Sequence, residues 1–339
     1  MYRQCTIKDI AKYLNLSIAT VSRALADSPK VRASTKEKVL KAAALFDYKP
    51  NPVALNLQKK RSGLIGLVVP ELRTSFFLPL INGIQKVLDT EGFHLIITQS
   101  NESKEIENKN LELLFSTFVD GIIISISSEG ANLERYNCIL KNEIPMVFVN
   151  RAVDQIHAPK IIIDDYKYAF LATEELIYNN LKNIVHFAGP AALDIAHKRK
   201  SGFRDAMIKH HLPLTDDSIR ETGLMFDNGY AEMKKLILQQ KLPEGIFCFS
   251  EPLALGSLKA IKECGLKCPD DVAIVSFSET EIAQFVEPTL TGIKQPTYEM
   301  GQKAASLILE TIISNKSLPD ETIYIPAKVN VRESSRKTK

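Results

Sequence analysis

One short segment near the N-terminus concentrates hydroxyl and guanidinium side chains. Ser17, Thr20 and Ser22 are followed directly by Arg23. Hydroxyl groups bind phosphate oxygens, and the planar fork of an arginine matches the acceptors on a guanine edge. A solvent-exposed helix rich in serine and threonine accounts for the same residues equally well. The segment is therefore a candidate nucleic-acid contact that needs support from the rest of the sequence.

The distribution of charge supports the nucleic-acid interpretation. Residues 1–61 contain 13 Lys and Arg against 4 Asp and Glu, whereas the remainder contains 30 against 36. A basic segment joined to an acidic domain is typical of proteins that bind a polyanion. A basic surface that is merely solvated is the alternative.

Helix signals around this segment predict a helix-turn-helix. Thr6 with Asp9 starts a first helix, and Ser17 caps a second one. Further helices are expected over 34–46 and, as a very short hinge helix, over 51–59. The second helix is left free to enter a major groove with its first residues against the base edges.

From residue 64 onward, apolar runs alternate with helical patterns. This alternation predicts parallel sheets covered by helices on both faces, because parallel strands need long crossover connections. So many strands favour two similar lobes over one oversized sheet. The predicted strands are 64–69, 94–98, 121–126, 146–149, 161–163, 184–187, 246–249 and 272–275. Residues 332–339 are expected to be a solvated tail.

Composition and missing motifs argue against several classes of protein. The chain lacks an N-terminal apolar run and any apolar stretch of about 18 residues, so we expect no membrane partner and a cytoplasmic location. The five scattered cysteines fit neither a disulfide framework nor a zinc site. Without a phosphate-binding glycine loop, a nucleophile elbow or a metal motif, we expect no enzyme, no cofactor and no metal. A transport binding protein, the other alternative, would need an export signal.

Several short motifs stand in a fixed order along the chain. They are Thr20-Val21-Ser22-Arg23, Tyr48-Lys49-Pro50-Asn51, Ala54-x-x-Leu57, Phe187-Ala188-Gly189-Pro190 and Arg199-x-x-Gly202-Phe203. In this order and at this spacing they resemble the lactose-repressor (LacI/GalR) family of transcription regulators. The similarity covers essentially the whole chain. What it implies is a DNA-binding regulator, expected to be a repressor, whose operator affinity is controlled by a small-molecule effector.

The resemblance also implies a domain organisation. An all-α helix-turn-helix headpiece is expected over 1–50, a hinge helix and linker over 51–62, and a two-lobed α/β effector domain with parallel sheets, similar to periplasmic binding proteins, over 63–339. The expected lobes are an N-lobe at about 63–161 plus 292–320 and a C-lobe at about 162–291 plus 321–339. The C-terminus carries no apolar heptads, so we expect a homodimer rather than a tetramer.

For DNA binding, the resemblance assigns residues in the headpiece and the hinge. Ile18 and Ala19 match two positions that vary with operator sequence, and both can touch thymine methyl groups but cannot bind adenine through an amide. Leu57 matches a leucine that wedges into the minor groove at the centre of a pseudo-palindromic operator. The remaining expected contacts are Ile7, Ser17, Thr20, Ser22, Arg23, Lys30, Arg32, Thr35, Asn51 and Ala54.

For the effector, expected to be a sugar or a sugar acid, the resemblance assigns a cleft between the lobes. The expected contacts are Phe76, Phe77, Asp164, Arg199, Ser250 and Ser278. Arg199 matches the family's effector-anchoring arginine, and aromatic rings suit the C–H face of a sugar. A helix N-cap is the alternative role for Asp164, and core packing is the alternative for the two phenylalanines.

One substitution in this cleft favours an anionic effector. Ser278 stands where many relatives have an aspartate, so Arg199 would lack an acid partner. A buried guanidinium is costly unless an anion completes the pair, and a sugar acid or phosphorylated sugar would supply it. Alternatively, Glu251 or Asp164 neutralises Arg199 and leaves a site for a neutral sugar.

The hinge assignment predicts the effect of Leu57→Ala. We expect operator binding to weaken by at most a few kcal/mol because the minor-groove wedge is lost, while salt-dependent non-specific binding stays nearly unchanged. Mobility-shift titrations at two salt concentrations measure both quantities. Operator affinity equal to wild type would rule out the wedge.

Overall fold

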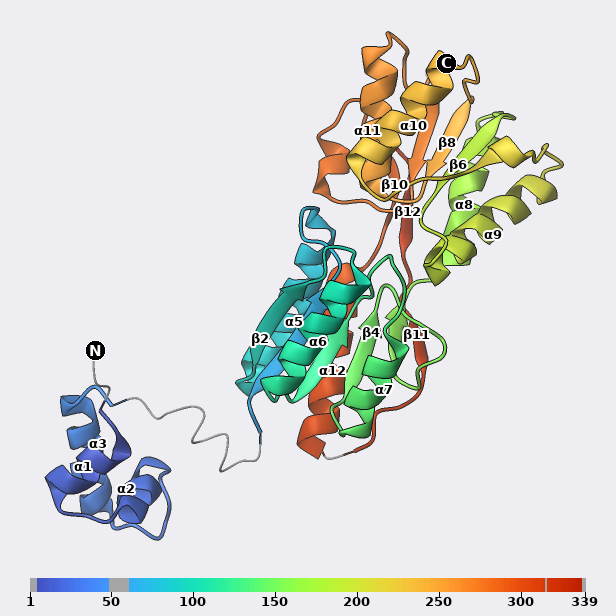
Figure 1. Cartoon of the computed structure of the whole chain (residues 1–339). Coiled ribbons are helices and arrows are strands. Elements are labelled where there is room, and N and C mark those ends of the chain that lie inside the picture. The colour runs from blue at the N-terminus through green and yellow to red at the C-terminus, as the bar shows by residue number, and fades with distance from the viewer. Residues whose placement is uncertain (1–4, 49–60, 315, 337–339) are drawn as a thin grey trace. The chain divides into compact units, whose positions relative to one another are not determined.

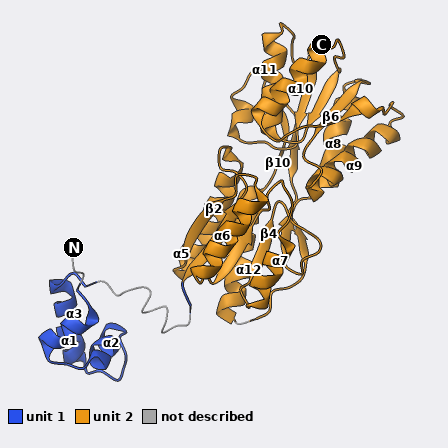
Figure 2. Cartoon of the chain, viewed as in Figure 1, with its two compact units in different colours: residues 1–62 blue, residues 63–339 orange. Residues whose placement is uncertain are grey.

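A computed structural model describes residues 5–48, 61–314 and 316–336 of the chain. The chain separates into two compact units, residues 1–62 and 63–339 (Figure 2). The expected hinge helix over 51–59 lies outside the described residues. Ser62 ends the first unit and Gly63 begins the second, directly after the run of basic residues that ends at Arg61.

The first unit is a bundle of three helices, α1 (Ile7–Leu14), α2 (Ile18–Leu25) and α3 (Ala33–Leu45). Ile10, Val21 and Val39 contribute one fully buried side chain from each helix. Small alanines from all three helices complete the core and let the helices approach closely. The short turn between α1 and α2 gives the helix-turn-helix that the capping signals predicted.

The second unit contains two six-stranded sheets (Figure 1). The first sheet has the strand order β11-β5-β4-β3-β1-β2, and the second has the order β12-β10-β9-β8-β6-β7. The first comprises β1 (Leu64–Val69), β2 (His94–Gln99), β3 (Gly121–Ile124), β4 (Met146–Val149), β5 (Lys160–Ile162) and β11 (Thr322–Tyr324). The second comprises β6 (Ile184–Ala188), β7 (Ile219–Glu221), β8 (Gly245–Cys248), β9 (Ala273–Ser276), β10 (Thr291–Lys294) and β12 (Lys328–Asn330). All pairings are parallel except β10 with β12.

Helices cover both faces of each sheet, which the strand sequences require. On β1, Leu67 points toward one apolar cluster and its neighbour Val68 toward another, because successive side chains alternate between faces. In the first lobe, α5 (Leu78–Glu91) and α12 (Thr297–Ser314) pack on one face, and α6 (Lys104–Ser116) and α7 (Leu133–Lys141) on the other. In the second lobe, α8 (Asp165–Tyr178) and α9 (Asp194–Lys209) oppose α10 (Phe226–Leu238) and α11 (Glu251–Glu263). Of the helices in the described ranges, none combines the length and hydropathy that crossing a bilayer requires.

The chain crosses between the lobes three times, and two crossings lie a few residues later than expected. β10 continues to Lys294 and pairs with β9, so residues 292–294 belong to the second lobe. β11 pairs with β5 of the first sheet, so residues 321–324 do not belong to the second lobe. The pairing of two short strands decides these boundaries, and short strands leave little periodicity in the sequence.

Two glycines allow α5 and α12 to pack against each other at close range. A Cβ atom at Gly83 would lie 2.1 Å from the Tyr298 carbonyl oxygen, and one at Gly301 would lie 2.2 Å from that of Leu80. The contact joins the N-terminal halves of the two helices. It therefore fixes the position of the short 3₁₀ segment η1 (Ser75–Phe77), which leads into α5.

The expectation of a solvated tail from residue 332 is wrong for its first half. Ser334 and Ser335 are fully buried. Ser334 Oγ accepts a hydrogen bond from Thr291 N at 2.8 Å and donates one to the Ile274 carbonyl oxygen at 2.8 Å. The segment thus packs against β9 and β10, where Ser334 satisfies backbone groups of both strands and Ser335 binds the side chains of Thr291 and Glu175.

Candidate functional site

Helix α2 presents several predicted DNA contacts on the surface of the headpiece. Ser17 Oγ accepts a hydrogen bond from Thr20 N at 3.1 Å and thereby caps the helix. Ile18 is 47% exposed and Arg23 is also exposed, whereas Val21 is fully buried. The helix therefore holds its inner face in the core and leaves apolar and hydrogen-bonding groups free on the outer face.

The turn after α2 presents two further cations. Lys30 and Arg32 are exposed, and a 2.6 Å ion pair between Lys36 and Asp27 ties the end of α2 to α3. Of the other predicted contacts in the headpiece, Ala19 is exposed and four are half-buried, namely Ile7, Thr20, Ser22 and Thr35. Asn51, Ala54 and Leu57 lie outside the described residues.

A cleft lies between the two lobes of the second unit, and both lobes line it. The first lobe contributes Glu71, Thr74, Phe76, Phe77, Glu102, Asn150 and Arg151. The second contributes Ile195, Arg199, Leu224, Met225, Phe249, Ser250, Pro252 and Ser278, and Gln295 lies on a crossing segment. Most of these residues follow the carboxyl ends of parallel strands, where ligands bind in open α/β sheets.

Arg199 is the most enclosed charged group of this cleft. Its guanidinium lies 3.6 Å from the ring centre of Phe277 and 4.2 Å from that of Phe249. Nη1 donates to the Phe249 carbonyl oxygen at 2.7 Å, and Nε donates to Asp165 Oδ1 at 2.8 Å. Burial lowers the pKa of Arg199 to about 10, which leaves the side chain protonated at neutral pH. Arg199 therefore lines the cleft, and its role as an effector anchor stays a prediction.

The acid that neutralises Arg199 is Asp165, which corrects two of the alternatives considered from the sequence. Asp164 does not line the cleft, because its Oδ1 accepts from Lys167 N at 2.9 Å and caps α8. Glu251 points elsewhere, since its carboxylate accepts from the backbone and hydroxyl of Thr280 at 2.8 and 2.6 Å. Of two adjacent aspartates, one caps the helix and the other faces the arginine.

The two predicted serines lie in the wall of the cleft and also support its backbone. Ser250 Oγ donates to the Leu224 carbonyl oxygen at 2.8 Å. Ser278 Oγ accepts from Glu251 N at 2.8 Å, and the residue is buried. Each hydroxyl is therefore already engaged, but a hydroxyl has further hydrogen-bonding capacity for a ligand.

Phe76 and Phe77 differ in burial, which bears on the two roles considered for them, core packing and ligand contact. Phe77 is buried in the core of the first lobe, and Phe76 is half-buried. The two rings pack edge to face with their centres 5.0 Å apart. Both line the cleft, so Phe76 is the ring with surface left for a ligand.

Sequence reasoning missed Arg151, a second arginine in the cleft. Its Nη1 and Nη2 bind the two carboxylate oxygens of Glu102 at 2.7 and 3.0 Å. Arg151 stands two residues after β4 and Glu102 three residues after β2. The position of each just beyond a predicted strand end was the signal that could have identified them.

Two buried polar atoms in the cleft wall have no hydrogen-bond partner among the described residues. They are Arg151 Nε, a donor, and Gln295 Oε1, an acceptor. An unsatisfied buried polar atom costs about 1–3 kcal/mol, so these atoms favour a ligand that supplies the missing partners. The charged residues that line the cleft are two acids and two bases, namely Glu71, Glu102, Arg151 and Arg199.

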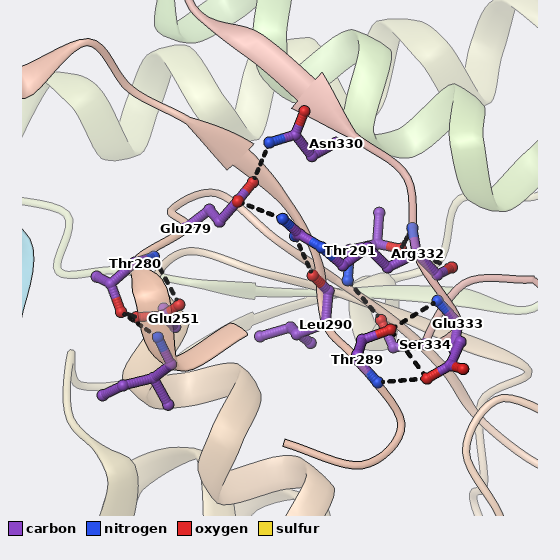
Figure 3. Close-up of polar contacts among 11 residues, drawn as sticks. Glu251, Glu279, Thr280, Thr289, Leu290, Thr291, Asn330, Arg332, Glu333 and Ser334 are labelled. Carbon is purple, nitrogen blue, oxygen red and sulfur yellow. Dashed lines mark hydrogen bonds and ion pairs between the residues drawn. The ribbon is translucent and has the colours of Figure 1, made fainter. Parts of the chain in front are cut away.

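The C-terminal segment holds one wall of the cleft in place (Figure 3). Glu279, next to the cleft residue Ser278, is bound by Arg332 and by Asn330, whose Nδ2 donates at 2.7 Å. Arg332 Nη1 also donates to the Leu290 carbonyl oxygen at 2.8 Å. The loop that carries Ser278 is thereby fixed to β12 and the chain end.

The buried ion pair predicts different effects for two adjacent substitutions. Asp165→Asn leaves Arg199 buried without a counter-charge and is expected to lower the free energy of unfolding by about 3 kcal/mol. Asp164→Asn, the matched control, retains a good N-cap and is expected to change it by less than about 0.5 kcal/mol. Urea denaturation followed by circular dichroism measures both. Equal stability of the two variants would show that the pair is unimportant.

Comparison with known proteins places these features in one family. The description "Bacterial regulatory proteins, lacI family" matches residues 6–51, and "Periplasmic binding protein-like domain" matches residues 173–335. A solved structure of the lac repressor dimer bound to operator and the anti-inducer ONPF superposes with a TM-score of 0.85 at 24% identity, covering 98% of this chain and 99% of that one. This likeness confirms the predicted fold class.

Two full-length relatives carry the assignment further. Catabolite control protein A of Priestia megaterium is 30% identical over 333 residues, 98% of this chain and 99% of that protein. The ribose operon repressor of Halalkalibacterium halodurans is 31% identical over 331 residues, 98% of this chain and 97% of that protein. The predicted resemblance is thus confirmed. With a helix-turn-helix headpiece, a two-lobed cleft and these relatives, the chain belongs to the LacI family of bacterial transcription regulators and is not an enzyme.

Proposed function

We propose that this protein is a cytoplasmic repressor that binds a pseudo-palindromic operator as a homodimer. Binding of a neutral sugar in the cleft either lowers or raises its affinity for the operator. The observation that carries this proposal is a ligand cleft lined by both lobes in a chain that also presents an exposed recognition helix. A ligand that touches both lobes stabilises one arrangement of them, which is how binding shifts a conformational equilibrium.

The headpiece supports recognition of duplex DNA. Arg23 is exposed on α2 and has the donor geometry to read a guanine, while Ile18 is exposed near the start of that helix and suits a thymine methyl group. Lys30 and Arg32 supply charge toward phosphates. The solved lac repressor structure was determined as a dimer on its operator, which supports the same assembly here.

The cleft supports a neutral effector over the sugar acid expected from the sequence. That expectation assumed that Arg199 lacks an acid partner, but Asp165 lies 2.8 Å from its guanidinium. Arg151 is likewise paired with Glu102. A ligand carboxylate would have to displace a protein carboxylate, whereas sugar hydroxyls can satisfy Arg151 Nε and Gln295 Oε1 without doing so.

The DNA-binding proposal is tested with DNA from upstream of the protein's own gene. The wild-type chain is expected to shift a symmetric site at nanomolar concentration and a half-site much more weakly, because each half-site engages only one headpiece. Arg23→Ala is expected to lose about 1–3 kcal/mol of specific affinity. Lys41→Ala, an exposed cation on α3, is the matched control. Equal affinity of the two variants, or equal binding of full site and half-site, would contradict the proposal.

The effector class is tested by calorimetry with a hexose and its uronic acid. The neutral sugar is expected to bind at least tenfold more tightly, a difference of about 1.4 kcal/mol, because both cleft arginines are already neutralised. Arg199→Ala is expected to abolish binding of either ligand. A tenfold preference for the uronic acid would restore the anionic interpretation.

A further inference from the structure

Three short crossings carry the chain between the lobes of the second unit, and the third lies beside the other two. In chain order the crossings are 163–164, 295–296 and 325–327 (Figure 1). Next to the first crossing, Ile325 N donates to the Ile162 carbonyl oxygen at 2.9 Å. Next to the second crossing, β12 pairs with β10, and Lys328 lies opposite Lys294. The third crossing is therefore the one whose two ends adjoin both of the others.

One tyrosine side chain holds the third crossing by its backbone. Tyr168 Oη donates to the Ala327 carbonyl oxygen at 2.8 Å and accepts from Ala327 N at 2.8 Å. Tyr168 is 7% exposed, and its ring belongs to the apolar core. Helix α8, which carries Tyr168, lies in the second lobe and begins directly after the first crossing. A single hydroxyl group thus binds both backbone groups of a residue in the third crossing, from a helix that starts at the first.

The first turn of α8 also contacts the effector cleft. The first residue of the helix, Asp165, accepts from Arg199 Nε at 2.8 Å. Tyr168 follows about one turn later, and Tyr168 N donates to the Asp164 carbonyl oxygen at 3.0 Å. The same helical turn therefore bears on the most enclosed charge of the cleft and on the third crossing. Any displacement of this turn moves both contacts together.

A second tyrosine on α8 makes a contact of the same kind that stays within one lobe. Tyr166 Oη donates to Asp205 Oδ2 of α9 at 2.8 Å. Both α8 and α9 belong to the second lobe, so this hydrogen bond joins no crossing. Tyr166 and Tyr168 thus lie two residues apart, each with a bound hydroxyl, and only the hydroxyl of Tyr168 reaches a segment that connects the lobes.

From these contacts we infer that Tyr168 is a positioning residue that sets the arrangement of the two lobes. Its hydroxyl holds the third crossing against α8, and through that crossing it restrains the other two. Tyr168 does not line the cleft, so it acts through the crossings and not by touching a ligand there. The inference rests on the proposed function in one respect, namely that operator affinity depends on the arrangement of the lobes. A contact present in one arrangement and absent from another shifts the equilibrium between them.

Hydrogen exchange on the full-length chain without ligand tests this restraint. Tyr168→Phe removes the hydroxyl and keeps the ring, so the packing of the core is retained. Amide exchange followed by mass spectrometry is expected to become about fivefold faster or more in peptides that contain Ala327 and in peptides that contain Thr297. Thr297 N donates to the Gln295 carbonyl oxygen of the second crossing at 2.9 Å, so its exchange reports on a crossing that Tyr168 does not bind directly. Tyr166→Phe, the matched control, is expected to change either rate by less than about twofold.

Operator binding measures the consequence for function. On DNA from upstream of the protein's own gene, Tyr168→Phe is expected to change the operator dissociation constant by about fivefold or more, and Tyr166→Phe by less than about twofold. Faster exchange at Ala327 alone, at neither residue, or equally in both variants would overturn the inference. Faster exchange at both residues in Tyr168→Phe with unchanged operator affinity would support the restraint and overturn the proposed dependence of operator affinity on the lobes.

Discussion

The buried pair of Arg199 and Asp165 organises the edge of the second sheet on which the ligand cleft depends. Its guanidinium binds the first residue of α8, the carbonyl that follows β8 and the rings of Phe249 and Phe277. A buried cation of this kind is tolerated only with a close acid and satisfied hydrogen bonds. Because the partners come from separate strand ends and helices, one ion pair holds several parts of the cleft wall together.

The first lobe repeats this arrangement with different residues. Arg151 follows β4 and Glu102 follows β2, two strands that β3 and β1 separate in the first sheet, and the two side chains form a two-point ion pair across the cleft wall. Each arginine thus has a carboxylate supplied by the protein. The cleft is left with hydrogen-bonding capacity but without a surplus of positive charge, and this balance supports the proposal of a neutral, hydroxyl-rich ligand.

The loop that carries Ser278 is held in place by hydrogen bonds and an ion pair on its outer side. Ser278 binds the backbone of Glu251, and Glu251 in turn binds Thr280. The neighbouring Glu279 is held by Arg332 near the chain end. The wall of the cleft that contains Ser278 is thus stabilised by contacts outside the cleft.

The sequence by itself determined the architecture and the family. Helix caps such as Ser17, the alternation of apolar strands with helical segments and the ordered motifs are local features, and local features are legible in a linear pattern. They predicted the helix-turn-helix, the two lobes of parallel strands and Arg199 as a cleft residue. The boundaries at the crossings were less accurate, because pairing of the short strands β10 and β11 depends on neighbours distant in the chain.

Only the tertiary structure decided which charges meet. Asp164 and Asp165 are indistinguishable by residue type, and the start of α8 turns one toward its own backbone and the other toward Arg199. Glu102 and Arg151 are far apart in sequence and meet because parallel strands bring their carboxyl ends to one edge. The sequence predicted an unpaired Arg199 and an anionic ligand, whereas the structure pairs both arginines of the cleft and supports the proposal of a neutral ligand. The prediction failed because ion pairing depends on distances of a few ångströms, and a linear sequence does not contain them.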